Sequence, residues 1–312
     1  MVRKQNKALY YIRNIARQLV PGAFYRALRQ KKQGEKGLYS EAEISERVSY
    51  YNKLQKPAAI GEDAFRLRDM PVFKSPKAYG FDTYEYTRYF DPGLKINLYR
   101  GDITWTQPVP TIQKSRPVSG DNANAVLLNL DKARHFVFVN DKKPFREKKD
   151  LLIGRGAMTQ SHRVRFMERY FGHPLCDLGH VGKPGLHDAW LKPRLSIPQH
   201  LDYKFILSLE GHDVATNLKW ILSSNSVAVM PEPKFETWFM EGRLVADQHY
   251  IRIREDYADL EERIRHFLDH PEKAEAIVHN ANAWVRQFFD PKKEDLIALL
   301  VLEKYFRLTQ ER

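Results

Sequence analysis

The sequence predicts a two-domain α/β protein, and three features of its 312 residues support this class. Single hydrophobic cores seldom grow beyond about 250 to 300 residues, so the length favours two domains. Residues 203–230 are patterned as strand, helix and strand, which is the building block of a parallel sheet. Glycine-flanked polar residues follow predicted strands at Arg100-Gly101-Asp102 and Gly154-Arg155-Gly156. We therefore expect ligands to bind in a cleft between two α/β domains.

The composition is that of a globular protein without a membrane span. Hydrophobic residues make up 43%, aromatic residues 12% and charged residues 29% of the chain. No segment approaches the roughly 20 apolar residues that cross a bilayer, and no secretory signal is recognisable at the N-terminus. The single cysteine, Cys176, forms no internal disulfide, which fits a reducing cytoplasm, and we expect it to serve as a packing residue.

The N-terminal arm carries most of the positive charge. Residues 1–36 contain ten Lys and Arg residues against one acidic residue, Glu35, which accounts for +9 of the net charge of +12. Apolar residues recur there at three- and four-residue spacing: Leu9, Ile12, Ile15, Ala16, Leu19 and Val20. Pro21-Gly22 ends this pattern, which predicts a short basic amphipathic helix.

Two interpretations of this helix stay open. It lies in the headgroup region of an anionic leaflet, or it packs on its own domain with its basic face in solvent. Nucleic acid is a weaker interpretation, because no recognised nucleic-acid-binding module accompanies the charge.

Periodicity and capping residues predict the remaining elements. Ser40 and Glu43 form a capping box before a helix that runs to about residue 54. Further helices are expected at 123–130, 161–170, from the Gly211 turn to about 223, and at 257–269, 271–289 and 293–308. Strands are expected at 94–99, 136–139, 151–153, 203–209, 226–230 and 250–253. The predicted division is an arm with a lead-in helix (1–56), an N-terminal domain (57–185) and a C-terminal domain (186–312).

Several residues are candidates for an anionic ligand and for acid–base chemistry. The Gly211 turn precedes a predicted helix, whose N-terminal amides would face a phosphate. Arg155 and Arg163 offer planar guanidinium donors to a diphosphate, although each also fits an ordinary surface or capping arginine. Asp102 follows a strand, where a carboxylate can take a proton from a substrate hydroxyl or can cap its own turn. The histidines lack metal-ligand spacing and no Asp-x-Asp pair occurs, so no divalent metal is expected.

Several long motifs resemble one enzyme family. The stretch 203–289 contains SLEGHDVATNLKWILSSNSVAVMP, FETWFMEGRLVADQHYIRI and DYADLEERI, which resemble the C-terminal signature of glycosyltransferase family 90. Upstream, KSRPVSGDNANAVLLNLDKARHFVFVND and FGHPLCDLG resemble the bacterial lipopolysaccharide core branch of that family. The matches follow in order over roughly residues 80 to 290.

The resemblance implies a GT-B fold, in which two Rossmann-like domains face each other across a cleft; here the basic helical arm precedes them. It also implies inversion at the anomeric carbon without an obligatory metal. The donor is a UDP-sugar, which is a co-substrate, and no separate cofactor is expected. Asp102 corresponds to the catalytic base, although the inserted Gly101 shifts the family's Arg-Asp pair by one residue.

The resemblance also assigns residues to donor binding. Arg155 and Gly156 match the family's Trp-Arg-Gly segment, and Arg163 falls on the arginine that contacts the diphosphate. In the turn after the strand predicted at 203–209, we expect donor contacts at Gly211 and Asp213. Eukaryotic members carry an arginine where this chain has Asn217, so Lys219 is the candidate substitute. Glu236 is the candidate for the ribose hydroxyls.

The predicted function is transfer of a hexose, glucose or galactose, from a UDP-sugar to a hydroxyl of a lipopolysaccharide inner-core sugar. The expected location is cytoplasmic and peripheral, on the inner face of the inner membrane, with the anionic leaflet as a partner and no nucleic acid. Alternatives are a non-catalytic membrane or nucleic-acid adaptor that uses the basic arm, or the same chemistry on a capsule polysaccharide or a protein.

Overall fold

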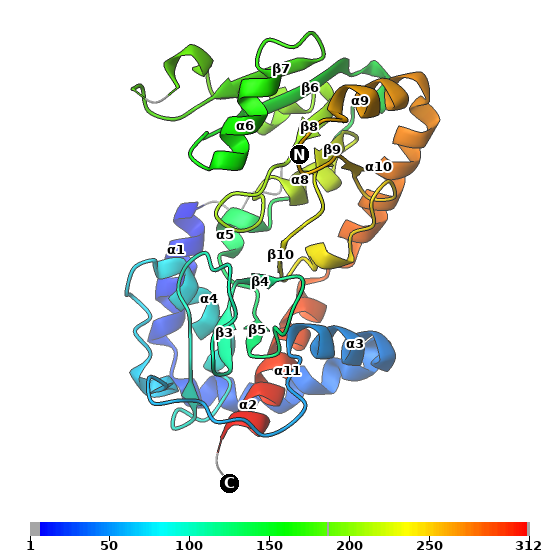
Figure 1. The fold of residues 1–312 in the computed structure, drawn as a ribbon. Coiled ribbons are helices and arrows are strands. Elements are labelled where there is room, and N and C mark those ends of the chain that lie inside the picture. The colour runs from blue at the N-terminus through cyan, green and yellow to red at the C-terminus, as the bar shows by residue number, and fades with distance from the viewer. Residues whose placement is uncertain (1–6, 186, 311–312) are drawn as a thin grey trace. The chain divides into compact units, whose positions relative to one another are not determined.

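The structure is a computed structural model that describes residues 7–185 and 187–310 (Figure 1). The chain forms two compact units, each built from separated stretches. The sheet unit comprises the described residues of 136–233 and 243–287, and the helical unit comprises those of 5–135, 234–242 and 288–312. The predicted mixed α/β class is confirmed. The GT-B arrangement and the domain limits at 56 and 185 stay predictions.

The sheet unit is built on five parallel strands in the order β11-β9-β8-β6-β7. Their bounds are β6 (Lys149–Gly156), β7 (Cys176–His180), β8 (Tyr203–Leu207), β9 (Val227–Met230) and β11 (Ile251–Arg252). The central strands are short apolar runs because both faces of a parallel sheet are covered. The chain order reverses between β6 and β8, and such a switch point is where open α/β sheets bind ligands.

Helices of this unit pack on the sheet through one continuous apolar core. The helices of this core are α6 (Ser161–Tyr170), α9 (Leu260–Asp269) and α10 (Pro271–Arg286). The unit also contains α7 (Ile197–His200) and α8 (Leu218–Leu222), with short 3₁₀ turns at Phe145–Glu147 and Asp188–Trp190. Gly154 in β6 permits close packing, since an added Cβ would lie 2.9 Å from a methyl group of Leu178. The predicted packing role of Cys176 is confirmed, because it contacts this core half-buried.

The helical unit has small two-stranded sheets among its helices. Its helices are α1 (Lys7–Ala16), α2 (Gly22–Gly34), α3 (Glu41–Tyr51), α4 (Lys77–Thr87), α5 (Lys132–His135) and α11 (Pro291–Thr309). Strands β1 (Phe65–Arg66) and β2 (Lys95–Ile96) pair antiparallel, as do β4 (Ser115–Pro117) and β10 (Phe235–Thr237), whereas β3 (Thr111–Gln113) and β5 (Ala125–Leu127) pair parallel. Short 3₁₀ turns occur at Arg17–Leu19, Glu35–Leu38, Leu67–Asp69 and Glu241–Arg243.

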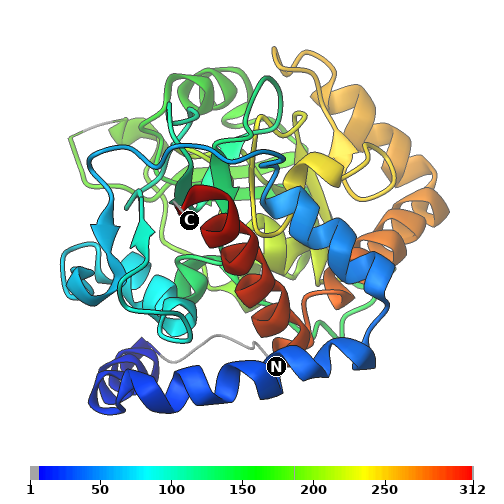
Figure 2. The same cartoon turned by 90° about the horizontal axis from the view of Figure 1, so that it is seen from below.

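Helix α11 forms the centre of the helical unit. It is apolar around much of its circumference and contacts both α3 and α4, as expected for a buried helix (Figures 1 and 2). Near its start, Glu294 accepts hydrogen bonds from Arg47 of α3, with the Nη2–Oε2 distance at 3.0 Å, and from the indole of Trp238. The Trp238 ring stacks on Tyr51 with centroids 3.8 Å apart. This buried network joins three distant segments of the chain.

Several predicted elements are confirmed, and others are wrong. The Ser40 cap, the helix at 161–170, the three C-terminal helices and the parallel strand–helix–strand unit of 203–230 are all present. The helix expected at 123–130 is wrong, because Ala125–Leu127 is the buried strand β5. No strand forms at 136–139, and a second helix, α2, begins where the arm pattern was expected to stop.

None of the described helices has both the length and the apolar character needed to cross a bilayer.

Replacing Glu294 by Gln should lower the free energy of unfolding by about 3 to 5 kcal/mol, because it leaves the buried Arg47 guanidinium without its counter-charge. Glu303→Gln on the same helix is the matched control. Glu303 pairs with Arg29 at the surface, with its side chain 41% exposed, so its loss should cost less than about 1 kcal/mol. Urea denaturation of both variants measures the difference, and equal costs would contradict the assigned role of the buried pair.

Candidate active site

Arg163 lies at the switch point of the parallel sheet. It belongs to the first turn of α6, and its guanidinium donates to the carbonyl oxygens of Leu209 and Glu210 at 2.8 Å each, just beyond the end of β8. A third bond, of 3.2 Å, reaches the carbonyl of Ala157 after β6. Arg163 thereby ties the ends of the two strands that flank the chain reversal. Among the described residues no carboxylate forms an ion pair with it, and burial lowers its pKa.

The structure brings Arg163 together with two other predicted residues, Gly156 and Gly211. An added Cβ would lie 3.8 Å from the Arg163 guanidinium at Gly156 and 3.5 Å from it at Gly211. His162, which the sequence analysis did not single out, places its Nε2 2.9 Å from the Glu210 carbonyl. The sequence signal that could have identified His162 is its position in the first turn of the predicted helix at 161–170. A cation without a carboxylate partner beside a helix N-terminus suits an anionic ligand.

Arg155 occupies a different environment. Its guanidinium donates to the Asp177 carboxylate and to the Asp177 carbonyl, both at 2.7 Å, and its side chain is only 7% exposed. Lys192 and Tyr203 also contact this carboxylate, at 2.9 and 2.8 Å. Because side chains alternate along a strand, Arg155 projects from the face of β6 opposite to that of Gly156 and Arg163. Its contacts are those of a structural ion pair, and diphosphate binding by Arg155 stays a prediction.

The Gly211 turn does not open directly into a helix. The following helix, α8, begins only at Leu218 and has five residues, so the expectation of helix amides at the turn is wrong. Asn217 explains part of this arrangement, because its side-chain amide donates to the Leu207 carbonyl at 2.9 Å and closes the end of β8. Asp213 is buried and Lys219 is fully buried. Donor roles for these two residues stay predictions.

Asp102 lies in the helical unit within a cluster of cations. Arg134 donates to its carboxylate at 2.8 Å and Tyr79 donates through its hydroxyl at 3.1 Å, and the buried Lys114 ammonium also contacts it. The preceding Gly101 has a φ of 148°, a backbone conformation that favours glycine. The side chain of Asp102 remains 27% exposed, so a substrate can still reach it.

The electrostatics of this cluster keep Asp102 ionised. Burial by itself raises the pKa of Asp102, but Lys114 and Arg134 outweigh burial and lower it to about 2. Arg100, which precedes the glycine, is bound elsewhere, since it donates to the carbonyls of Pro71 and Lys74 at 2.6 and 2.9 Å. Asp102 is therefore an ionised carboxylate and a weak base while its cations remain in place, and its role as the catalytic base stays a prediction.

Glu236 is buried within the helical unit, in β10. Its Oε1 accepts from the fully buried Arg116 at 2.7 Å, and its Oε2 accepts from the hydroxyl of Tyr50. Both carboxylate oxygens therefore already accept hydrogen bonds. These contacts are structural, and ribose binding by Glu236 stays a prediction.

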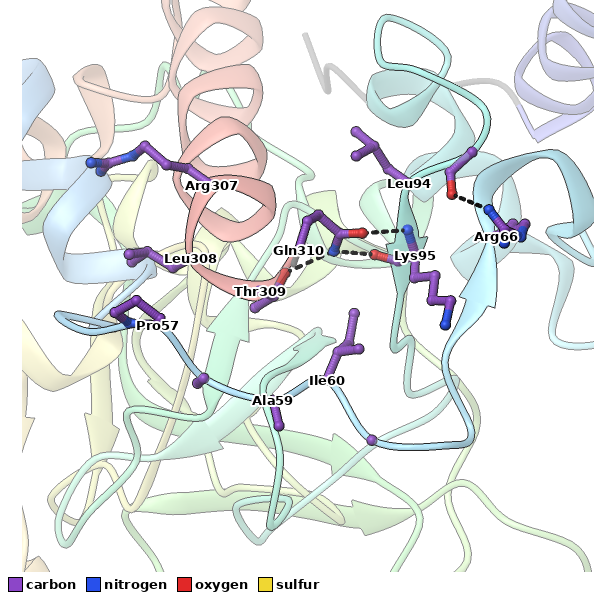
Figure 3. A pocket seen from close by; sticks show the side chains of 13 residues that line it. Pro57, Ala59, Ile60, Arg66, Leu94, Lys95, Arg307, Leu308, Thr309 and Gln310 are labelled. Atoms are coloured by element: carbon purple, nitrogen blue, oxygen red, sulfur yellow. Dashed lines mark hydrogen bonds between the residues drawn. The ribbon is translucent and has the colours of Figure 1, made fainter. Parts of the chain in front are cut away.

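A large cavity in the helical unit has no connection with the predicted site. Figure 3 shows it between the 57–61 segment, β2 and the end of α11, with a volume of about 1000 Å³. Gln310 bridges its wall by bonding both backbone groups of Lys95. None of its lining residues is a candidate for catalysis or donor binding. Within the described ranges no three His, Cys, Asp or Glu side chains are placed to hold a metal ion.

Comparisons with known proteins identify the class of this chain. Residues 137–311, more than half of the sequence, match the family model described as Glycosyl transferase family 90. The O-glucosyltransferase LpsA of Dichelobacter nodosus is 47% identical over 269 residues, covering 86% of this chain and 84% of that protein. Uncharacterized protein 027R of Frog virus 3 is 32% identical over 127 residues, 39% of this chain and 13% of that protein. The chain is thus a glycosyltransferase. It belongs to glycosyltransferase family 90.

Arg134→Gln should raise the pKa of Asp102, because it removes one of the two neighbouring cations. In the wild type the folded-state pKa of about 2 lies below the ordinary 3.8. The cluster therefore stabilises the protein above about pH 4, and this contribution disappears as the pH falls toward 2. NMR titration of carboxylate carbons measures the change, with Arg68→Gln at the exposed Asp69 pair as control. Titration of wild-type Asp102 at pH 4 or above would contradict the cluster.

Proposed function

We propose that this enzyme transfers a hexose from a UDP-sugar to a hydroxyl of a lipopolysaccharide inner-core sugar, with inversion at the anomeric carbon. The curated relative with 47% identity is named an O-glucosyltransferase, which favours glucose over galactose as the donor sugar. The resemblance of the upstream segments to the lipopolysaccharide branch supports the acceptor. Membership of the family favours an enzyme over the adaptor alternative.

The observation that carries the donor assignment is the position of Arg163. A UDP leaving group gains negative charge as the glycosidic bond breaks, and a fixed guanidinium stabilises that charge without rearranging. Arg163 is held in place by three carbonyl oxygens, and among the described residues no carboxylate neutralises it. It lies in the first turn of the ten-residue helix α6, whose dipole adds to the positive potential. We therefore place the diphosphate beside Arg163, Gly156 and Gly211.

Asp102 is the proposed base for the acceptor. The acceptor oxygen attacks the anomeric carbon, the bond from that carbon to the UDP oxygen breaks, and UDP leaves with the electron pair. The acceptor hydroxyl becomes strongly acidic as its oxygen bonds to carbon, so even a carboxylate with a pKa near 2 accepts the proton late in the step. Lys114 and Arg134 hold the carboxylate ionised and ready for this transfer.

The proposed location is the cytoplasmic face of the inner membrane, where the enzyme is peripheral and meets a lipid-linked core. The described helices include none that spans a bilayer, and the basic amphipathic arm supplies the contact. Assays with core oligosaccharide, capsule polysaccharide and protein acceptors side by side distinguish the proposed acceptor from the two others.

Arg163→Gln should weaken UDP binding by about ten- to a hundredfold, because a charge-assisted contact to the diphosphate is lost. Arg165→Gln on the exposed side of the same helix is the control and should leave affinity unchanged. Calorimetric titration with UDP, ADP and GDP in the presence of EDTA measures affinity and base selectivity. Absence of UDP binding by the wild type would overturn the donor assignment.

Asp102→Asn should reduce transfer by at least about a hundredfold while UDP affinity is retained, because the proton acceptor is lost and the donor contacts are not. Asp121→Asn, an exposed carboxylate of the same unit, serves as the control. Release of UDP in the presence of acceptor is the measurement. Turnover of Asp102→Asn at the wild-type rate would remove this residue from the role of base.

A further inference from the structure

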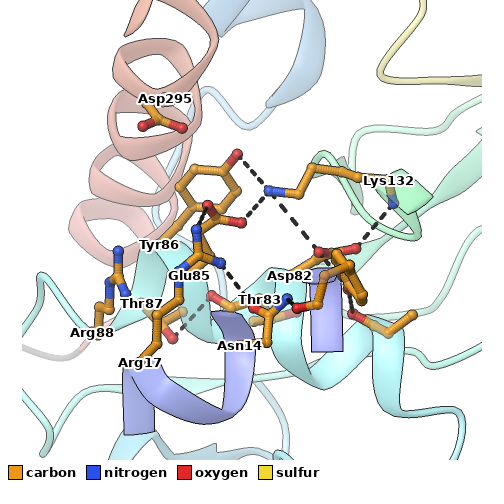
Figure 4. Close-up of polar contacts among 12 residues, drawn as sticks. Asn14, Arg17, Asp82, Thr83, Glu85, Tyr86, Thr87, Arg88, Lys132 and Asp295 are labelled. Carbon is orange, nitrogen blue, oxygen red and sulfur yellow. Dashed lines mark hydrogen bonds and ion pairs between the residues drawn. The ribbon is translucent and has the colours of Figure 1, made fainter. Parts of the chain in front are cut away.

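Helix α1 is attached to the helical unit by polar contacts and by the Tyr10 ring, which packs in an apolar cluster with Met70 and Phe81. The Tyr10 hydroxyl donates to the Asp82 carboxylate of α4 at 2.8 Å, and Arg17 forms an ion pair with Glu85 one turn further along α4. Asn14, which is 2% exposed, lies between them and accepts from Arg17 at 2.8 Å. Figure 4 shows this cluster, in which Glu85 also contacts Lys132. These contacts fix the rotation of α1 about its own axis.

The apolar side of α1 therefore faces solvent. At 100° per residue, Leu9, Ile12 and Ile15 lie on the side opposite to Tyr10 and Asn14. The exposed fractions are 63% for Leu9, 63% for Ile12 and 49% for Ile15, and Leu19 just beyond reaches 82%. Most large apolar residues that the structure describes as exposed belong to this arm: Leu9, Tyr11, Ile12, Ile15, Leu19 and Phe24. A surface patch of this kind marks a contact with another phase or molecule.

A basic cavity lies just beyond the end of α1. It has a volume of about 680 Å³, and its walls include Gln18 and Gly22, which lie on either side of Leu19 in the sequence. Its charged lining residues are all cations: Arg26, Arg68, Lys74 and Arg88. The Arg88 guanidinium stacks over the Tyr25 ring at 3.8 Å, and its buried Nε and Nη1 atoms have no hydrogen-bond partner in the described part of the chain. Phe73, 54% exposed, adds an apolar residue to the wall.

We infer that the apolar face of α1 and the adjoining basic cavity together form a docking surface for an anionic lipid bilayer. Leu9, Ile12, Ile15 and Leu19 enter the boundary between headgroups and acyl chains, and lipid phosphates bind the exposed cations of the cavity, Arg26, Arg68 and Lys74. A second copy of the chain is a poorer occupant, because pairing this face with itself would bring like charges together. Only the purpose of this surface rests on the proposed function, because the surface would hold the enzyme at a lipid-linked acceptor.

The test is flotation of the full-length protein with vesicles of phosphatidylglycerol and phosphatidylethanolamine, compared with vesicles of phosphatidylcholine alone. We expect binding to the anionic vesicles that falls as salt is raised, and at least about tenfold weaker binding to phosphatidylcholine. The double variant Ile12→Glu/Ile15→Glu should weaken binding by at least about tenfold, because it places charges in the immersed face. Val245→Glu, which changes an apolar residue of the sheet unit that is 46% exposed, is the matched control.

A second variant tests the cavity separately. Arg26→Gln/Lys74→Gln should reduce binding to the anionic vesicles several-fold and remove most of its salt dependence. The inference would be overturned if Ile12→Glu/Ile15→Glu bound the anionic vesicles as well as the wild type, or if Val245→Glu lost as much binding. It would also be overturned if the wild type were a dimer that Ile12→Glu/Ile15→Glu converts to a monomer. UDP affinity and transfer to a water-soluble acceptor should stay at wild-type levels in every variant. If the wild type transfers no sugar, the proposed function fails while the vesicle result still decides the docking surface.

Discussion

Two buried ion pairs are the constraint on which the helical unit depends. Arg47 pairs with Glu294 and Arg116 pairs with Glu236, and all four side chains are almost entirely withdrawn from water. A buried charge costs several kcal/mol unless its partner is present. These pairs join α3, β4, β10 and α11, so the unit is complete only when the chain has returned from the sheet unit twice. Tyr51, which stacks on Trp238, contacts both pairs, because its hydroxyl accepts from Arg47 and its carbonyl accepts from Arg116.

In the sheet unit, the order of the strands is the constraint that positions the candidate site. Because β6 lies between β7 and β8, the loops after β6 and β8 diverge at their carboxyl ends, and the first turn of α6 lies beside them. Arg163 bridges these ends through carbonyl oxygens, and no described carboxylate forms an ion pair with it. Arg155, only eight residues earlier, is neutralised by Asp177. The two arginines thus have different surroundings, because Arg155 projects from β6 toward Asp177, whereas Arg163 lies in α6 beside the strand ends.

Much of the local structure could be predicted from the sequence, because caps and helical periodicity act over a few residues. The Ser40 cap and α6 are such cases. The strand β5 was misassigned because a three-residue run buried on all sides has no amphipathic period. Of the residues predicted to bind the donor, Arg163, Gly156 and Gly211 lie close together, whereas Glu236 lies in a buried ion pair whose partner, Arg116, is 120 residues away. Local sequence contains no information about such partners.

The N-terminal arm separates what the sequence and the tertiary structure each decide. Spacing of apolar residues determined that residues 7–16 form an amphipathic helix, because helix geometry places every third and fourth residue on one face. Which face is buried was decided only in the folded chain. Asp82 and Glu85 of α4 lie about 70 residues away and bind Tyr10 and Arg17. Their hydrogen bonds and ion pair hold the polar side of α1 inward, so the apolar side is left in solvent.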